Sequence, residues 1–292
     1  MNYSSISRIF EKLSPKLTTP DMVKRLPVKC NLRALSTLSF IITVSVVIVS
    51  IAGIISQESI YRTEILANTF VPNDIVNLLI GVPFILISLL LTMRGKLTGL
   101  FCWPGALFYF IYVYFPYIIC IPVSYLFIPH LIILTASLYT LIGVIVNIDG
   151  SALKKKVAKN VPARTFGAIL VAFGILILLR QTWLILDTVI NDKTIVTQEL
   201  AVWIDDYIFG SPAMIIGGVL LWRRKSLGYV LGPGLFLVFG ILTFGLIPFT
   251  IIQSHLNDIS PGISSISVLL LISAACIVPF IFFLRGVNKK YN

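Results

Sequence analysis

The sequence predicts an all-helical integral membrane protein with eight transmembrane helices, arranged as two tandem four-helix repeats of the same orientation. Three observations support this prediction. The mean hydropathy is +0.97 and only 12% of the residues are charged. Eight apolar stretches approach or exceed the length needed to cross a bilayer, and a motif recurs 129 positions along the chain. Soluble cores cannot bury so much apolar surface, whereas a bilayer solvates it.

Each apolar stretch is interpreted as one span, because a helix needs about 20 residues to cross the hydrocarbon. The expected spans are 34–56, 75–93, 97–119, 123–147, 165–188, 208–222, 227–252 and 262–284. The sixth is the shortest, and we expect it to begin earlier, near Trp203, with Asp205 and Asp206 in its outer turn. The first stretch is too long, and starts too late, for a cleaved signal peptide.

Basic residues alternate between successive loops. They gather in the N-terminal tail, in every second loop and at the C-terminal end, whereas the remaining loops hold only Arg62 and Lys193. The positive-inside rule therefore places both termini in the cytoplasm and the chain in the cytoplasmic membrane. The net charge of +11 is then explained by topology, and no nucleic acid partner is expected.

The same pattern divides the chain into five segments. These are a basic cytoplasmic tail at 1–33, a first repeat at 34–148, a basic linker at 149–164, a second repeat at 165–286 and a short tail at 287–292. Residues 1–17 have apolar side chains at helical spacing, which fits a helix on the inner membrane surface or a disordered basic tail. In the linker, Gly150, Ser151 and Pro162 are expected to break helical structure.

The repeat itself rests on eight identities between residue n and residue n+129. They are Gly81 and Gly210, Pro83 and Pro212, Arg94 and Arg223, Lys96 and Lys225, Gly99 and Gly228, Pro104 and Pro233, Gly105 and Gly234, and Phe110 and Phe239. Because each copy contains an even number of spans, both copies enter the membrane in the same direction.

The repeated prolines and glycines predict helix bends. Pro83 and Pro212 are expected early in the second span of each repeat. Pro104-Gly105 and Pro233-Gly234 are expected to bend or locally unwind the next span. Two interpretations stay open: packing geometry inherited by duplication, or paired broken helices that form a binding site near the middle of the membrane.

Arg180 is the charged residue least suited to its position, because it lies well inside the fifth span. Such a charge needs a partner or a wet cavity. Asp187 lies two helical turns further on, on the same face, and either it or an acid from another span could approach Arg180. The alternatives are an anion-binding or gating arginine and a structural arginine paired near the outer interface.

Most acidic residues fall on the predicted outer side, and the repeat aligns Glu58 with Asp187 and Asn77 with Asp206. These pairs could form two facing polar rims, or they could simply be solvated loops. The third span is rich in tyrosine, and Tyr109, Tyr112 and Tyr117 need hydrogen-bond partners if they are buried. The second repeat lacks these tyrosines, so any role they have is asymmetric.

Motifs of soluble enzymes, paired cysteines and phosphate loops are absent from the sequence, so no cofactor or metal is expected. A membrane enzyme stays open as a third, less favoured class, and it would need a compact cluster of Asp, His or Tyr facing one pocket. The segments TMRGKLTGLFCWPGALFYFIYVYF and LWRRKSLGYVLGPGLFLVFGIL resemble uncharacterised multi-pass membrane proteins of prokaryotes. This resemblance covers the two hairpins and implies a fold but no activity.

The leading hypothesis for function is a transporter or permease with its pathway between the repeats. Its candidate polar lining consists of Arg180, Asp187, Asp206, Glu58 and Asn77, and its substrate would be a small molecule or an ion. The alternative is a non-transporting scaffold or partner subunit, which acts through a homo-oligomer or a second protein in the bilayer.

Overall fold

Eight helices long and apolar enough to cross a membrane dominate the computed structural model, which describes residues 26–159, 161–257 and 262–288. The spans are Arg33–Ile55, Glu64–Met93, Leu97–Cys120, Phe127–Asn147, Ala163–Ile190, Thr197–Trp222, Ser226–Leu256 and Ile263–Arg285. The prediction of eight membrane helices is confirmed. The surface helix considered for residues 1–17 lies outside the described residues.

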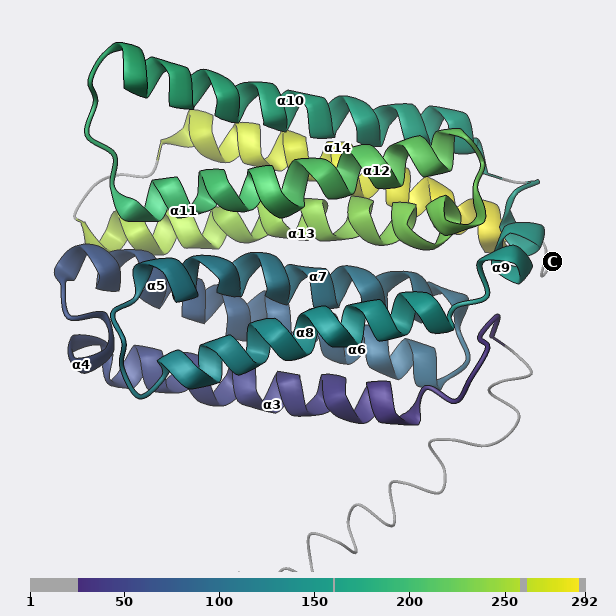
Figure 1. The fold of residues 1–292 in the computed structure, drawn as a ribbon, viewed down its shortest axis with the longest axis horizontal. Helices are drawn as coiled ribbons and strands as arrows, with labels where there is room; N and C mark the ends of the chain where they lie inside the picture. The colour runs from purple at the N-terminus through teal and green to yellow at the C-terminus, as the bar shows by residue number, and fades with distance from the viewer. Residues whose placement is uncertain (1–25, 160, 258–261, 289–292) are drawn as a thin grey trace, which may run out of the picture.

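The first four spans form one group of helices. It contains α3 (Arg33–Ile55), α4 (Gln57–Tyr61), α5 (Glu64–Val76), the π-helical turn η1 (Asn77–Gly81), α6 (Val82–Met93), α7 (Leu97–Cys120) and α8 (Phe127–Asn147). We call this set the first group. After the connecting helix α9 (Gly150–Val157), the second group contains α10 (Ala163–Ile190), α11 (Thr197–Asp205), η2 (Asp206–Gly210), α12 (Ser211–Trp222), α13 (Ser226–Leu256) and α14 (Ile263–Asn288). Figure 1 shows the two groups stacked with their helices roughly parallel or antiparallel.

The second and sixth spans are longer than the sequence indicated. Both begin 11 residues before the predicted start, at Glu64 instead of residue 75 and at Thr197 instead of residue 208. The expected start of the sixth span near Trp203 was therefore also too late. Polar residues lowered the local hydropathy, but Asp74, Asp205 and Asp206 are buried inside the bundle, so the helix continues through them.

A π-helical turn interrupts each of these two spans at corresponding positions. The turns η1 and η2 begin at Asn77 and Asp206, which are 129 positions apart. Pro83 and Pro212 follow each turn as the second residue of α6 and α12. The expectation that these prolines lie early in their spans was wrong. They lie deep in a continuous helix, where the wider turn accommodates the carbonyl that a proline leaves without its usual donor.

The two groups meet along α7 and α13, which pack against each other. At their closest approach a Cβ built on Gly105 would lie 2.7 Å from the carbonyl oxygen of Gly234, so only glycine fits there. Both helices run unbroken through Pro104 and Pro233. Of the two predicted effects, local unwinding is therefore wrong, and a bend stays a prediction. The Pro-Gly pairs serve instead as flat packing surfaces where two backbones approach each other.

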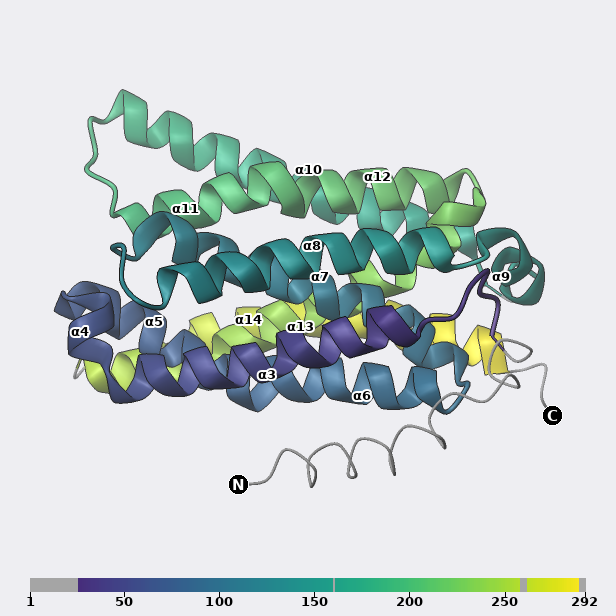
Figure 2. The same cartoon turned by 60° about the horizontal axis from the view of Figure 1, so that its bottom comes forward.

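The connection between the groups is helical at Gly150 and Ser151, where a break was expected, whereas the break expected at Pro162 is present just before α10. Gly150 and Ser151 form the first turn of α9, because the Asp149 side chain accepts hydrogen bonds from the backbone N–H groups of Ser151 and Ala152, each at 3.0 Å. Leu153 and Val157 are buried beneath it. Figure 2 shows α9 at the end of the bundle where α3 begins. The first half of the basic linker is thus a docked helix.

Candidate functional site

The most connected polar cluster of the second group surrounds Asp206, the first residue of the π-helical turn η2. Its carboxylate accepts a hydrogen bond of 2.7 Å from the Tyr112 hydroxyl and a second from the amide nitrogen of Gln181. Tyr112 belongs to α7 of the first group, whereas Gln181 lies on α10. Asp206 therefore joins three helices and connects the two groups through a partly buried hydrogen bond.

Asp205, the neighbouring residue, has a very different environment. Its side chain is 0% exposed, and neither carboxylate oxygen has a hydrogen-bond partner among the described residues. The Oε1 atom of Gln181 and the hydroxyl of Ser211 are also buried without a partner. Buried polar groups are nearly always hydrogen-bonded, so unpartnered oxygens on three side chains near one helical turn indicate a place where water or a ligand can bind.

Arg180 lies on α10 next to this cluster and interacts electrostatically with Asp206. It is exposed on the helix surface. By helix rise, it lies about 25 Å from the start of α10 and about 15 Å from its end, within the depth of the hydrocarbon. Asp187, one of its two predicted partners, instead forms an ion pair of 2.6 Å with Lys193 at the end of α10. The acid beside Arg180 therefore comes from another span, the second arrangement that the sequence allowed.

Asn77 occupies the same place in η1 that Asp206 occupies in η2. It is fully buried, and its Oδ1 atom accepts a hydrogen bond of 3.1 Å from the Tyr109 hydroxyl. Each π-helical turn thus opens with a polar side chain that binds a tyrosine of α7. Glu58, by contrast, is exposed on α4. The structure therefore places Asn77 and Asp206 at the bundle interior, and Glu58 and Asp187 near the loops at one end.

A second buried carboxylate lies in the first group. Asp74 of α5 is 0% exposed, and it accepts hydrogen bonds from the hydroxyls of Tyr61 and Tyr117, the latter at 2.8 Å. A Cβ at Gly53 of α3 would collide with this carboxylate and with the Tyr61 hydroxyl. Glycine at position 53 is therefore needed for the helices to close around Asp74. This cluster was missed from sequence, where Asp74 was grouped with the outer acids.

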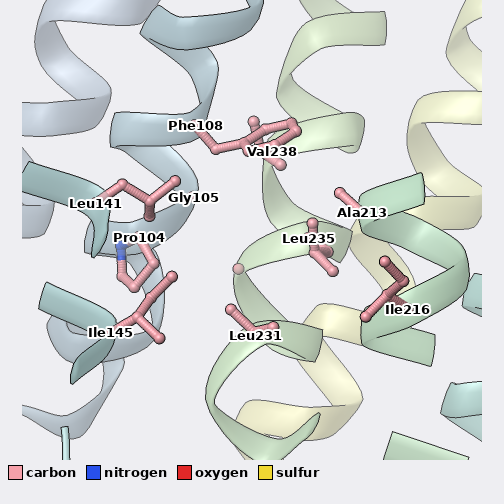
Figure 3. A pocket seen from close by; sticks show the side chains of 11 residues that line it. Pro104, Gly105, Phe108, Leu141, Ile145, Ala213, Ile216, Leu231, Leu235 and Val238 are labelled. Carbon is pink, nitrogen blue, oxygen red and sulfur yellow. The ribbon is translucent and has the colours of Figure 1, made fainter. Parts of the chain in front are cut away.

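The cavity between the two groups is apolar. It has a volume of about 200 Å³ and lies between α7 and α8 on one side and α12 and α13 on the other (Figure 3). Its lining residues are Pro104, Gly105, Phe108, Leu141, Ile145, Ala213, Ile216, Leu231, Gly234, Leu235 and Val238. The expected polar pathway beside the Pro-Gly pairs is therefore not in this cavity. The polar groups lie nearer to η1 and η2.

In the described part of the chain, no group of three or more His, Cys, Asp or Glu side chains comes together as a possible metal site. The four cysteines are free. Among oxygen donors, the set around η2 consists of Asp205, Asp206, Gln181 and Ser211, which suits a weakly bound cation or water better than a transition metal.

No protein-family model, curated protein or solved structure matches this chain. The similarity of its two hairpins to prokaryotic multi-pass membrane proteins therefore stays an expectation. Function has to be inferred from the buried polar residues themselves.

Proposed function

We propose that this protein is a carrier in the cytoplasmic membrane, with both termini cytoplasmic, which moves an ion or a small polar molecule between its two groups of helices. The two groups are taken as tandem copies of one four-span unit. Four features support the duplication: the π-helical turns at the same offset, the proline that follows each turn, the contact of Gly105 with Gly234, and the recurring hairpin motif.

The observation that carries the proposal is the hydrogen bond from Tyr112 to Asp206. Ionisable residues at membrane depth are expensive, and they usually mark a pathway for ions or substrates. Here the carboxylate of Asp206 lies where the first group meets the second, next to the unpartnered carboxylate of Asp205 and the cation of Arg180. A purely structural interface gains little from such a set of charges.

The bond suggests how the carrier could work. When Tyr112 binds Asp206, the groups are closed at the level of η2. Separation of α7 from η2 would break this single bond and expose Asp205 and Asp206 to a substrate beside Arg180. The close-packed glycines of α7 and α13 are a suitable pivot, because tightly packed backbones resist sliding but tolerate small rotations. Asn77, Glu58 and Asp187 are then proposed to line the route toward the outer surface.

The test combines a ligand screen with an uptake assay. Purified protein is screened by thermal shift against sodium, potassium, calcium, phosphate, dicarboxylates and amino acids, because a bound ligand raises the melting temperature. A labelled form of any compound that binds is then offered to proteoliposomes. We expect Arg180→Ala to abolish uptake, while the variant still inserts and folds normally.

Arg164→Ala is the matched control, since Arg164 is an exposed arginine in the first turn of the same helix. It should leave uptake near the wild-type rate. The carrier proposal is rejected if binding and uptake by Arg180→Ala equal those of wild type, or if the bound compound never crosses the bilayer in any preparation.

The alternative, a partner subunit, is favoured by one specific observation. Arg180 is exposed on α10, and only 17% of the residues in the most apolar stretch of this helix are buried. A lipid-facing arginine is costly, roughly 2.5–3.5 kcal/mol on insertion scales, so a second copy or another membrane protein could cover this face. Cross-linking from Trp183 on the same helix would then trap a dimer or a foreign subunit in native membranes.

A further inference from the structure

Several buried polar atoms inside the first group, away from the cluster at η2, have no hydrogen-bond partner among the described residues. They are the hydroxyls of Ser50, Tyr114, Ser137 and Thr140 and both ring nitrogens of His130. None of these side chains is more than 1% exposed. They come from three helices that pack together, α3, α7 and α8. Such groups lose too much free energy without partners to stay dry.

The three members on α8 lie on one face of that helix. His130, Ser137 and Thr140 are separated by seven and three residues, which is helical spacing, and they span about 15 Å along the axis. Ile133 and Val144 are buried on the same face. The polar atoms are therefore arranged in a file along the membrane normal, toward the interior of the first group.

Helix α3 supplies hydroxyls at matching depths. Figures 1 and 2 show α3 and α8 side by side and antiparallel, and a Cβ at Gly143 would touch Leu35. Counting away from this contact places the hydroxyls of Ser39, Thr43 and Ser50 at about the depths of Thr140, Ser137 and His130. The Nε1 atom of Trp103 donates a bond of 3.0 Å to Ser39 at the far end of this file.

The other end of the file meets Asp74. The ring of His130 lies 4.9 Å from the ring of Tyr117, centroid to centroid, and Tyr117 donates to Asp74. Ser50 and Tyr114 also face this carboxylate, and Ser50 is close enough to interact with both Asp74 and Tyr114. The titratable groups around Asp74 are thus Tyr61 from α4, Tyr114 and Tyr117 from α7, and His130 from α8.

We propose that the first group contains a file of internal water molecules along α3, α7 and α8, and that this file conducts protons to and from Asp74. Buried waters bind where several unpartnered polar groups converge, and each typically makes about three hydrogen bonds. A proton passes along such a chain when each donor releases one proton to the next acceptor as it receives another. The net change is one proton gained or lost by the Asp74 carboxyl, with no other bond altered.

Tyr61 is a hydrogen-bond donor to Asp74 at the end of the first span. It lies in the short helix α4, and burial raises the pKa of its hydroxyl, with a further increase from the neighbouring Asp74 carboxylate. Tyr61 therefore stays protonated and donates to Asp74 at any physiological pH. This inference deepens the proposed function. It rests on that function in one respect only, namely that the proton would be the coupling ion of the carrier.

Proton movement can be measured without any substrate. The protein is reconstituted in vesicles of phosphatidylethanolamine and phosphatidylglycerol with a pH-sensitive dye inside, and a potassium gradient with valinomycin drives protons inward. Wild type should acidify the lumen at least about tenfold faster than empty vesicles. Asp74→Asn and Thr140→Val should return the rate to that of empty vesicles. Both changes preserve side-chain size, so the fold should survive.

The matched control is Thr250→Val, which removes a threonine hydroxyl that is only partly buried and is bonded to its own helix α13. It should conduct like wild type. A second readout, independent of the variants, is hydroxyl-radical labelling of wild type, in which internal water marks adjacent side chains. Tyr114 and His130 should be labelled, although they are buried, whereas the equally buried Phe236 should not.

The path is overturned if wild type conducts no faster than empty vesicles, if Thr140→Val conducts like Thr250→Val, or if Tyr114 and His130 stay as unlabelled as Phe236. These outcomes do not depend on the uptake assay. A carrier that takes up its substrate without proton conduction would retain the proposed function and lose this path. Proton conduction without uptake of any ligand would support this path and reject the proposed carrier function.

Discussion

Gly105→Ala is expected to lower the free energy of unfolding, whereas Gly143→Ala should leave it almost unchanged. In both variants the new Cβ would begin 2.7 Å from its nearest neighbour. At position 105 that neighbour is the backbone carbonyl oxygen of Gly234, which cannot move without shifting α13. At position 143 it is the terminal methyl of Leu35, which can rotate away. The two variants therefore compare a contact with backbone and a contact with a side chain at the same starting distance.

The magnitudes follow from opposing terms. Exchange of glycine for alanine inside a helix contributes roughly 0.5–1 kcal/mol of stability. Overpacking against a fixed backbone costs about 1–3 kcal/mol, and a shifted side-chain rotamer about 0.5–1.5 kcal/mol. Thermal unfolding of the purified variants measures the difference. Equal melting temperatures for Gly105→Ala and wild type would mean that α7 and α13 are not in backbone contact.

Asp205→Leu should stabilise the protein, and Asp206→Leu should destabilise it, although the two residues are adjacent. Asp205 is buried and has no partner among the described residues, so its replacement removes an unsatisfied group worth about 1–3 kcal/mol. Replacement of Asp206 leaves the Tyr112 hydroxyl and the Gln181 amide without their acceptor. Each stranded donor costs a similar amount.

In the variants Asp205→Leu and Asp206→Leu, the change in uptake should not follow the change in stability. If Asp205 binds an ion or a substrate, Asp205→Leu gains stability and loses transport, which is the usual trade-off at a functional site. Melting temperature and uptake are measured on the same preparations. A fall in melting temperature of Asp205→Leu that matches the fall for Asp206→Leu would show that Asp205 has a stabilising partner, and this interpretation of the site would be abandoned.

The membrane class and the number of spans could be predicted from sequence because hydropathy reports directly on contact with lipid. The same measure failed at Asp74, Asp205 and Asp206, because it treats a polar residue as exposed. The partners of Asp74 and Asp206 come from other helices, Tyr117 from α7 and Gln181 from α10, and no local pattern reveals them. The need of the α7 tyrosines for buried partners was correctly anticipated from their chemistry.

The glycines and prolines were recognised from sequence, but the local unwinding considered for the Pro-Gly pairs is absent. Pro104 and Gly105 indicated a bend or an unwound segment, since proline removes a helical hydrogen bond. In the bundle, the helix stays intact and the small residues allow α13 to approach. Likewise Pro83 follows a π-helical turn that sequence periodicity does not encode. Tertiary packing decides between these outcomes, and only the three-dimensional structure contains that information.

The orientation of the two groups is most directly tested by side-specific labelling of single cysteines in a cysteine-free background. Cysteines introduced at Lys96, Lys155 and Lys225 should react only with reagent on the cytoplasmic side, and those at Glu58 and Asp192 only with reagent on the outer side. This is the result that two tandem groups of four spans require. Reaction of positions 96 and 225 from opposite sides of the membrane would contradict it.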